Sequence, residues 1–565
     1  MTRLVNVPEE FPAEAVRGFV LANKRYVKPV FGGVVRSTAT GQGKVAVVYG
    51  GGSGHYPAFA GWVGHGFADG AVCGNIFSSP SAAQAYSVMK AAERGAGVLM
   101  GFGNYAGDVL HFGQAIERLR SEGIQADTLV VTDDIASGSK DEIAKRRGIA
   151  GDFPTFKIAG AAAEAGKDFD EVKRIFAKAN DATRTFGVAF DGCTLPGADG
   201  PLFTVPEGTM GIGLGIHGEP GVSEAPLGTA DDVAKTLVDG LLDDRPASAG
   251  NRVVVIVNGL GDTKYEEMFV TTGNIVDRLE AAGIEIVDVE SGEFVTSLDM
   301  AGISLTLVWV DDELLEYWDA PCDAPAYRKG SVGDVQRDDA VLNAEAAAVE
   351  VTEQGSQASQ AVAQKVIGLL DAIHHKMEES KEELGRIDAV AGDGDHGIGM
   401  ANGSRAALKT ARELADKGAG AQTLLAGAGE AWSDGAGGTS GALWGAILTA
   451  VGAVLGDRDA TGEDTVGKSL TAALEAVQRL GGAQVGDKTM VDALAPAVEA
   501  YQAASGSVVE RLTTAAAAAA QGAESTKPLV AKLGRSRPLG EKSVGTPDPG
   551  AVSFTQIVEV IGANL

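Results

Sequence analysis

Short apolar runs recur through the first 330 residues, and helical patterns separate several of them. The runs lie at 45–50, 97–103, 128–134, 252–259 and 303–310. Short, β-branched and largely apolar segments are typical of central strands that are buried on both faces. The helical patterns between them, such as 13–26 and 81–95, predict a mostly parallel sheet covered by helices. This part of the chain therefore predicts an α/β domain.

The pattern changes twice beyond residue 330. Residues 331–357 are polar and lack a strong apolar period, so we interpret them as an interdomain linker that is partly helical around 343–351. From 358 to 565, alanine-rich segments carry an apolar stripe with a period of 3.6 residues, which predicts an all-α bundle. The sequence thus predicts a multidomain chain, α/β plus all-α, with its parts at 1–330, 331–357 and 358–565.

Composition narrows the function classes. The chain has 565 residues, too many for one ordinary domain, and 45% of them are hydrophobic, enough for sizeable cores. The formal net charge of −29 argues against a nucleic-acid or anionic-membrane surface, since both need basic patches. Cys73, Cys193 and Cys322 lack metal-ligand spacing, and the N-terminus lacks a signal peptide's apolar core, so we expect a cytoplasmic protein.

One stretch, 435–456, carries no charge and is long enough to span a bilayer. It also holds seven glycines, Thr439 and Ser440, and charged residues flank it closely. We interpret it as a loop that enters a buried helix of the bundle, and we expect no membrane span.

The first candidate site runs from Gly50 to Gly54 and ends at His55, directly after the first apolar run. Glycines at such a place let successive backbone N–H groups converge on an anionic or carbonyl oxygen, and His55 could move a proton there. The alternative is a tight turn before a helix, with a surface histidine. Four glycines in five residues favour the site.

Asp108 and His217 each have a structural alternative. Asp108 follows a strand-like run and could bind a substrate hydroxyl or act as a base, but an aspartate there is more typical of an Asx turn or a helix cap. His217 lies in a glycine-rich stretch, where a neutral imidazole could attack a carbonyl carbon. A structural histidine explains that pattern equally well.

Asp388, Asp393 and Asp395 place three carboxylates within eight residues. Such a cluster suits a hard cation, and magnesium held with nucleotide phosphates fits it. An EF-hand would need ligands where Gly397 and Ser404 stand, so that interpretation fails. A solvated acidic turn is the remaining alternative, but the apolar surroundings make unpaired carboxylates costly there.

Two glycine-containing stretches in the second half resemble phosphate loops. Gly437 to Gly441 opens an uncharged helix, and its backbone donors with Thr439 and Ser440 suit phosphate binding, helix capping or both. Residues 462–469 match the P-loop pattern literally. A P-loop must follow a buried strand, whereas this stretch follows a helical pattern and would place two acidic residues in the cradle, so we reject it.

Eight motifs occur here in the order in which they occur in the dihydroxyacetone kinase family, in its single-chain, ATP-dependent form, and the chain resembles that family over nearly its whole length. They are GGGSGH (50–55), NYxGD (104–108), CTLPG (193–197), GIHGEPG (215–221), DGDxG (393–397), GGTSGALWG (437–445), GDKTMVDAL (486–494) and VGTPDPGA (544–551). The resemblance implies a DhaK-like α/β domain that holds the ketose and a DhaL-like helical barrel that holds ATP and Mg²⁺.

The resemblance also implies roles for individual residues. His217 matches the histidine that bonds covalently to the ketose carbonyl as a hemiaminal, while His55 and Asp108 match groups that assist proton transfer and orient hydroxyls. The implied substrate contacts are Gly52, Ser53, Gly54, His55, Asp108 and His217, and the implied magnesium ligands are Asp388, Asp393 and Asp395. The implied nucleotide contacts are His396, Gly397, Ile398, Thr439, Ser440, Gly481, Thr489, Met490, Asp548, Pro549 and Gly550.

The chain departs from the family pattern at Tyr56, Phe59, Gly103, Ala106 and Arg537. The usual lysine is replaced by Gly103, which removes a cation and, we expect, opens space for a ketose larger than dihydroxyacetone. We therefore favour a tetrulose, and D-erythrulose in particular. The alternatives are an FAD-AMP lyase (cyclising) activity and a non-catalytic ketose-sensing protein. The resemblance further implies a homodimer.

Overall fold

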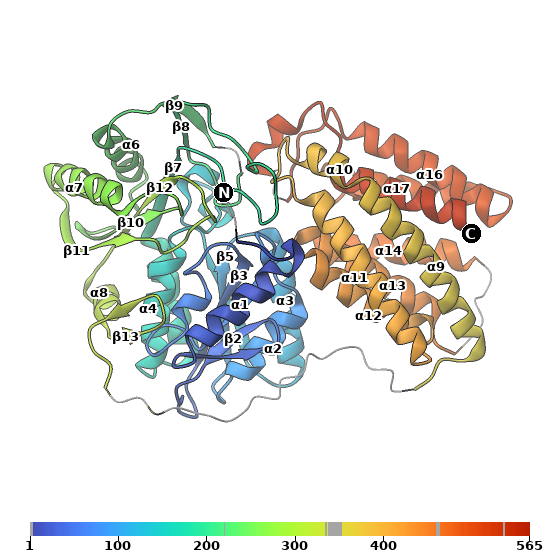
Figure 1. The fold of residues 1–565 in the computed structure, drawn as a ribbon, viewed down its shortest axis with the longest axis horizontal. Helices are drawn as coiled ribbons and strands as arrows, with labels where there is room; N and C mark the ends of the chain where they lie inside the picture. Colours follow the sequence, from blue (N-terminus) through green and yellow to red (C-terminus); the bar gives the residue numbers. More distant parts are fainter. Residues whose placement is uncertain (1–3, 220, 334–335, 337–352, 459–463, 535–536) are drawn as a thin grey trace. The chain divides into compact units, whose positions relative to one another are not determined.

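The computed structural model describes residues 4–219, 221–333, 336, 353–458, 464–534 and 537–565 (Figure 1). The chain divides into two compact units, Met1–Ala346 and Ala347–Leu565. The linker predicted at 331–357 falls mostly on residues 334–335 and 337–352, which lie outside the described residues. The boundaries at 330 and 358 stay predictions.

The first unit holds two six-stranded sheets and a two-stranded ribbon. The first sheet has the order β1-β2-β4-β3-β5-β6, with strands Val27–Val30 (β1), Gly33–Arg36 (β2), Gly70–Ile76 (β4), Ala46–Ser53 (β3), Val98–Gly103 (β5) and Ala126–Val131 (β6). The second has the order β11-β10-β12-β7-β8-β9, with strands Glu285–Gly292, Arg252–Gly259, Gly302–Trp309, Thr183–Ala189, Thr209–Ile212 and Ser223–Pro226. The ribbon pairs Cys322–Asp323 (β13) with Arg328–Lys329 (β14).

The expected parallel pairing is confirmed in the first sheet and wrong in the second. Strands β4, β3, β5 and β6 pair in parallel, but β12 runs antiparallel to both β10 and β7. A helix connects β10 to β11, as a parallel crossover requires. Residues 293–301 connect β11 to β12 without a regular helix, and the chain returns in the opposite direction. An apolar run shows that a strand is buried but does not reveal its direction.

Helices cover both faces of the first sheet, and alternating strand residues fill two cores. The helices of this unit are Phe11–Ala22 (α1), Ala82–Ala92 (α2), Ala106–Ser121 (α3), Asp152–Glu164 (α4), Phe169–Asp181 (α5), Ala230–Asp243 (α6), Tyr265–Ala281 (α7) and Asp312–Asp319 (α8). Val48 packs into the core under α2 and α3, whereas Val47 packs with α4. In the second sheet Val255 packs under α6 and α7, and Ile256 joins the Val47 core. The two sheets therefore share one core.

The second unit is a closed ring of helices, as the resemblance implies. In ring order the helices are Gln357–Glu379 (α9), His396–Asp416 (α11), Ala421–Ala436 (α12), Gly438–Leu455 (α13), Thr465–Gly481 (α14), Val491–Ala503 (α15), Val508–Ser525 (α16) and Pro549–Asn564 (α17). Each contacts the next, and α17 contacts α9, which closes the ring; the short α10 (Lys381–Asp388) packs on α11 and α17 (Figure 1).

Helix α13 is the membrane-length stretch discussed above. Among the described residues, it is the helix long and apolar enough to cross a bilayer, and a third of that stretch is buried. Trp444 and Leu448 lie in the core of the ring, and α12 and α14 flank the helix. The expected helix of the bundle is therefore present, but it begins at Gly438 and is only partly buried. The rejected P-loop at 462–469 begins outside the described residues, and the described residues just before it, 456–458, follow α13 rather than a strand.

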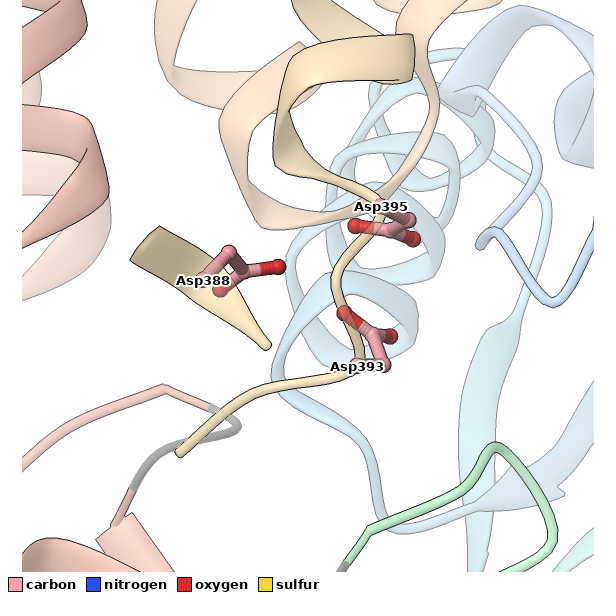
Figure 2. Close-up of side chains that lie close together, drawn as sticks. All are labelled: Asp388, Asp393 and Asp395. Atoms are coloured by element: carbon pink, nitrogen blue, oxygen red, sulfur yellow. The ribbon is translucent and has the colours of Figure 1, made fainter. Parts of the chain in front are cut away.

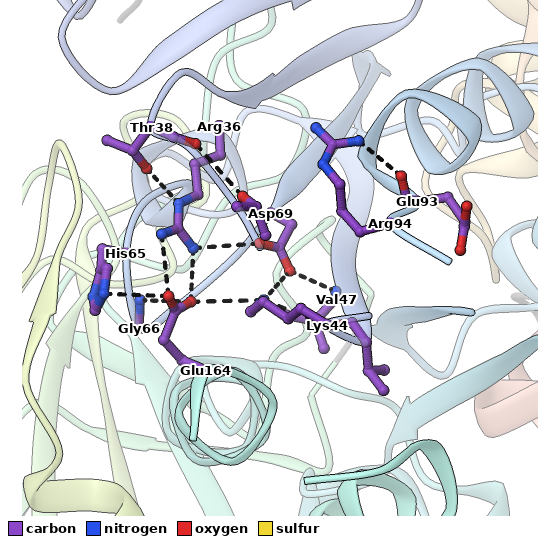
Figure 3. Close-up of polar contacts among 12 residues, drawn as sticks. Arg36, Thr38, Lys44, Val47, His65, Gly66, Asp69, Glu93, Arg94 and Glu164 are labelled. Atoms are coloured by element: carbon purple, nitrogen blue, oxygen red, sulfur yellow. Dashed lines mark hydrogen bonds and ion pairs between the residues drawn. The ribbon is translucent and has the colours of Figure 1, made fainter. Parts of the chain in front are cut away.

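A buried ion-pair network lies at the start of the first sheet's parallel strands, at the edge opposite the glycine run. Arg36 donates to both carboxylate oxygens of Glu164, at 2.6 and 3.1 Å, and Lys44 contacts Asp69 (Figure 3). Asp69 also accepts from the backbone N–H of Val47 at 2.9 Å. Burial alone would raise the pKa of Glu164, but the hydrogen bond from Arg36 and the nearby cationic charges lower it to about 2. The network therefore ties β2, β3 and β4 to the end of α4.

We predict that Glu164 stabilises the first unit above pH 4.5 and stops doing so as the pH falls towards 2. Its pKa is depressed in the folded state, so the folded state favours the ionised form, a contribution of about 3 kcal/mol. Urea denaturation of the wild type and Glu164→Gln at pH 7 and pH 3 checks this, because pH 3 lies inside the range in which the contribution is lost. The substitution should lower the midpoint at pH 7 and flatten its pH dependence, whereas Glu117→Gln, at an exposed ion pair, should change neither. An unchanged midpoint in Glu164→Gln would contradict the prediction.

Candidate functional site

The glycine run follows from the close approach of other chain segments to the end of β3. A Cβ on Gly52 would lie 2.7 Å from the backbone nitrogen of Ser78, and one on Gly54 would lie 2.8 Å from the ring of Phe77. Gly54 also has a φ of 104°, which disfavours any residue with a side chain. The glycines thus bring bare backbone to the carboxyl edge of the parallel strands, where α/β proteins bind ligands.

His55 and His217 form a pair beside this backbone, although they are 162 positions apart in sequence. Their Nε2 atoms lie 3.0 Å apart, and both side chains are buried. The Nδ1 of His55 is 2.7 Å from the backbone oxygen of Thr296, and the Nδ1 of His217 is 3.2 Å from Oε1 of Glu219. Neither histidine is a surface residue, so the surface histidine of the turn alternative is wrong, although a turn at 56–59 does follow His55.

Aromatic rings enclose the histidine pair. The ring of Phe77 stacks on His55 with centroids 5.0 Å apart, and the ring of Tyr105 meets His217 edge-on at 4.7 Å. Asp108 is buried in the first turn of α3, whose N-cap is Tyr105, so Asp108 is not the capping residue. Asp108 therefore follows Tyr105, whose ring contacts His217, by three positions in sequence.

One expectation about the departures from the family pattern needs correction. A Cβ on Gly103 would lie 2.9 Å from the oxygen of Gly148 and 3.1 Å from the Tyr105 ring, so the missing lysine leaves no open space. Tyr56 and Phe59 line a cavity of about 450 Å³ with α1 and Gly52–Gly54. His55, His217 and Asp108 are not among its lining residues. These two departures therefore line a cavity that includes Gly52–Gly54 but not the histidine pair.

The three aspartates of the second unit meet in space. Asp388 ends α10, and Asp393 and Asp395 lie in the turn that leads to α11 (Figure 2). Each offers an oxygen within 4.8 Å of the others. Burial and the charge of Asp388 raise the pKa of Asp395. A cation would relieve this repulsion, and carboxylate oxygens are the ligands that Mg²⁺ prefers, so the residues fit a magnesium ion.

His396 links the acidic turn to the starts of two helices. Its Nδ1 is 3.1 Å from Oγ of Ser440 in α13, and its Nε2 is 3.0 Å from Oγ of Ser553 in α17. Helix α13 begins after Gly437 without a side-chain cap, so Thr439 and Ser440 do not cap it. The hydroxyl of Ser440 instead fixes the imidazole beside the aspartates.

The last motif of the chain reaches the same region. Asp548 caps α17 through a 2.7 Å bond from the N–H of Ala551, and burial raises its pKa to about 7, with the charges of Asp492 and Asp388 adding to the rise. A Cβ on Gly550 would lie 3.5 Å from Cβ of Met490. Thr489 donates its N–H to Asp492 at 2.8 Å. The remaining expected contacts are placed by their helices: Gly397 and Ile398 start α11, Gly481 ends α14 and Pro549 starts α17.

Lys488 connects two of these segments. The sequence alone did not predict a role for it. Its ammonium donates to the backbone oxygens of Leu529, Ser543 and Thr546, at 3.1, 2.6 and 2.8 Å. The side chain is 4% exposed, and burial lowers the pKa of the amine. Lys488 is part of the motif GDKTM, so its position could be recognised. Its carbonyl partners lie 41 to 58 positions away in sequence, and no local pattern predicts them.

If the chain binds ATP and a ketose as the resemblance implies, Lys488→Met should raise the KM for ATP about tenfold and leave the KM for the ketose nearly unchanged. The substitution deprives three buried carbonyls of their donor and loosens Thr489 and Met490 against the 546–550 segment. Steady-state kinetics with each substrate varied separately checks this. Lys532→Met, at an exposed lysine that pairs with Asp487, is the matched control. Equal changes in both KM values would contradict the prediction.

The comparisons with known proteins agree with this arrangement. A model of the Dak1 domain matches residues 17–326, and a model of the DAK2 domain matches residues 390–563. Two proteins of Mycolicibacterium smegmatis are each 54% identical: an L-erythrulose 1-kinase, over 100% of both chains, and a D-erythrulose kinase, over 98% of this chain and 97% of its own. The crystal structure of the C. freundii dihydroxyacetone kinase with AMP-PNP and Mg²⁺ covers 100% of both chains, with 30% identity and a TM-score of 0.54.

The fold and the two clusters of residues define the class, a Dak1 domain fused to a DAK2 domain in one chain. The chain belongs to the dihydroxyacetone kinase family. The family and the fold class that the resemblance implied are confirmed. The roles of the individual site residues stay predictions.

Proposed function

We propose that this chain is an ATP-dependent kinase that phosphorylates a terminal hydroxyl of a short ketose, with a tetrulose as the preferred substrate. The observation that carries the proposal is the buried histidine pair beside the bare glycine backbone, with Nε2 atoms 3.0 Å apart. The names of the two relatives that are 54% identical support a tetrulose. One relative is named for L-erythrulose and the other for D-erythrulose, so the names do not decide the enantiomer. D-erythrulose therefore stays our prediction.

The α/β unit would hold and orient the ketose. Nε2 of His217 forms a bond to the carbonyl carbon, His55 delivers the proton that the carbonyl oxygen needs, and backbone N–H groups of Gly52, Ser53 and Gly54 contact the ligand. Asp108 accepts a hydrogen bond from the hydroxyl that reacts. Such a covalent anchor selects compounds with a reactive carbonyl and fixes the terminal hydroxyl for transfer.

The helical unit would hold ATP and Mg²⁺. Asp388, Asp393 and Asp395 are the proposed magnesium ligands, and His396, Thr439, Ser440, Met490 and Asp548 belong to the proposed nucleotide site. A bound magnesium ion would neutralise the charge that develops on the transferred phosphoryl group. Because both units belong to one chain, each is present near the other at a raised effective concentration.

The substrate proposal is tested by the kcat/KM values for D-erythrulose, L-erythrulose, dihydroxyacetone and glyceraldehyde at saturating ATP. We expect the two tetruloses to exceed dihydroxyacetone, with D-erythrulose first. A clear preference for dihydroxyacetone would overturn the tetrulose proposal, and a preference for L-erythrulose would overturn only the enantiomer. Release of cyclic FMN from FAD, measured in parallel, would reveal a lyase activity.

Two further proposals concern the state of the protein in the cell. The family resemblance supports a homodimer and a cytoplasmic location. Light scattering of the purified chain tests the first, since a dimer gives twice the chain mass. Fractionation of the producing cells tests the second.

A further inference from the structure

Glu219 makes two contacts with His217 from within the same loop. Its Oε1 lies 3.2 Å from Nδ1 of the imidazole, and its Oε2 accepts the backbone N–H of His217 at 3.0 Å. The carboxylate is 2% exposed. Contacts to both the ring and the backbone of one residue fix the orientation of that ring.

Arg147 holds the carboxylate from its other side. Nη1 of Arg147 is 3.7 Å from Oε2 of Glu219, and the guanidinium is anchored by Asp134, which accepts from Nε at 2.9 Å. Burial alone would raise the pKa of Glu219, but the charges of His217 and Arg147 hold it well below its usual range. Glu219 is therefore an ionised carboxylate in a buried site, and it only accepts hydrogen bonds.

The partners of the two outer ring nitrogens determine where the hydrogens lie. The oxygen of Thr296 can only accept, so Nδ1 of His55 carries hydrogen, and the carboxylate of Glu219 can only accept, so Nδ1 of His217 carries hydrogen. The two Nε2 atoms lie 3.0 Å apart, and their contact needs a third hydrogen. A neutral imidazole carries one, so three hydrogens on two rings mean one extra proton, whose charge the carboxylate balances.

We propose that Glu219 is the positioning residue of this site, holding His217 with hydrogen on Nδ1 and stabilising one proton shared between the Nε2 atoms of His55 and His217. Carboxylates hold the tautomer of an active histidine in this way in the serine proteases. The use of the proton in catalysis rests on the proposed kinase function, whereas its presence in the resting protein does not.

The shared proton balances the addition of a ketose. The lone pair on Nε2 of His217 forms the C–N bond, the carbonyl π pair moves onto oxygen, and the proton, left on His55, passes to that oxygen. The positive charge then resides on the alkylated ring of His217, whose Nδ1–H still points to Glu219. One carboxylate thus compensates the charge before and after the addition.

Asp134 and Tyr105 are titratable groups near the pair that do not take the role of Glu219. Asp134 pairs with Arg147 at 2.8 Å, and the hydroxyl of Tyr105 stays protonated because burial raises its pKa well above the usual value. Asp108 lies one helical turn after Tyr105 on α3. Glu219 is a carboxylate in direct contact with a ring nitrogen of the pair, 3.2 Å from Nδ1 of His217.

Nitrogen NMR of the full-length chain, labelled with ¹⁵N in the histidine rings, tests the proton count directly. The signals of the two rings are assigned with His55→Gln and His217→Gln. We expect hydrogen on both Nδ1 atoms at neutral pH and Nε2 shifts between the protonated and bare values. Glu219→Gln should lose the shared proton, and Glu224→Gln, at an exposed carboxylate of β9, should keep it. A wild-type His217 with hydrogen on Nε2 alone, or a Glu219→Gln variant that keeps three protons on the two rings, would overturn the proposal.

Binding of dihydroxyacetone labelled with ¹³C at its carbonyl carbon tests the consequence for the adduct. Glu219→Gln should weaken adduct formation about 10- to 100-fold and raise the KM for the ketose more than it lowers kcat, and Glu219→Asp should restore part of the affinity. Unchanged affinity in Glu219→Gln counts against the proposal. Should the wild type show no kinase activity, the proposed function fails while the nitrogen shifts still decide this inference. Should it be active with only two protons on the rings, this inference alone fails.

Discussion

His217→Ala should lower kcat/KM for the ketose by at least about a thousandfold. The substitution removes the nucleophile that would anchor the carbonyl, and with it the orientation of the terminal hydroxyl, which is worth several kcal/mol in comparable intramolecular reactions. Coupled measurement of ATP consumption checks the loss, and the KM for ATP should stay close to its wild-type value. The loss would then be confined to the ketose side of the reaction.

His375→Ala is the matched control for that variant. His375 is an exposed histidine on α9, with 72% of its side chain accessible, and its ion-pair partner is Asp371 on the same surface. It should retain full activity. A His217→Ala protein that keeps more than a tenth of the wild-type activity would show that the covalent anchor is not needed.

Asp393→Asn should abolish turnover and, in the absence of metal, make the helical unit more stable. Three carboxylates within 4.8 Å repel one another, so removing one charge relieves the folded state while it also removes a ligand for magnesium. Thermal unfolding in EDTA and with Mg²⁺ and ATP checks both effects. The wild type should gain stability on adding the ligands, because they bind the native state, and the variant should not.

Asp416→Asn is the control on the same helix, because Asp416 is exposed at the end of α11. It should respond to Mg²⁺ and ATP as the wild type does. A ligand-dependent shift in Asp393→Asn equal to that of the wild type would contradict the assignment of the aspartates. The adduct with a ketose should form normally in Asp393→Asn, which separates the two halves of the mechanism.

The local pattern was sufficient for the strands that are apolar and buried on both faces. The runs at 45–50, 97–103, 128–134, 252–259 and 303–310 are all strands, and the helical repeats after residue 358 are helices. The short or partly exposed strands, such as β9 with its exposed Ser223 and Glu224, carry no such signal. Strand direction was also beyond reach, because it depends on the connections rather than on the residues of the strand.

The site residues were visible in the sequence, but their partners were not. Glycine density marked His55 and His217, and the spacing of the acidic turn marked Asp393. The pairing of His55 with His217 joins residues 162 positions apart, that of His396 with Ser553 joins residues 157 apart, and only the fold brings them together. Glu219 follows His217 by two positions in sequence. A single carboxylate in a loop is usually exposed, so the sequence did not predict that Glu219 is buried.

The departures from the family pattern show a different limit. The replacement of a lysine by Gly103 led us to expect a larger pocket, because the volume of the missing side chain was assumed to stay empty. The structure fills that volume with Gly148 and the Tyr105 ring. The packing around a residue depends on all of its neighbours. A single substitution therefore does not show how much space the pocket has.

The most direct test of the central claim is ketose-dependent ATP consumption by the purified full-length chain with Mg²⁺, with the product followed by phosphorus NMR. We predict turnover with erythrulose, formation of a phosphate ester on a terminal carbon, and no turnover when either the ketose or the magnesium is left out. ATP consumption that is the same with and without a ketose, or no consumption with any short ketose, would contradict the assignment of this protein as a ketose kinase.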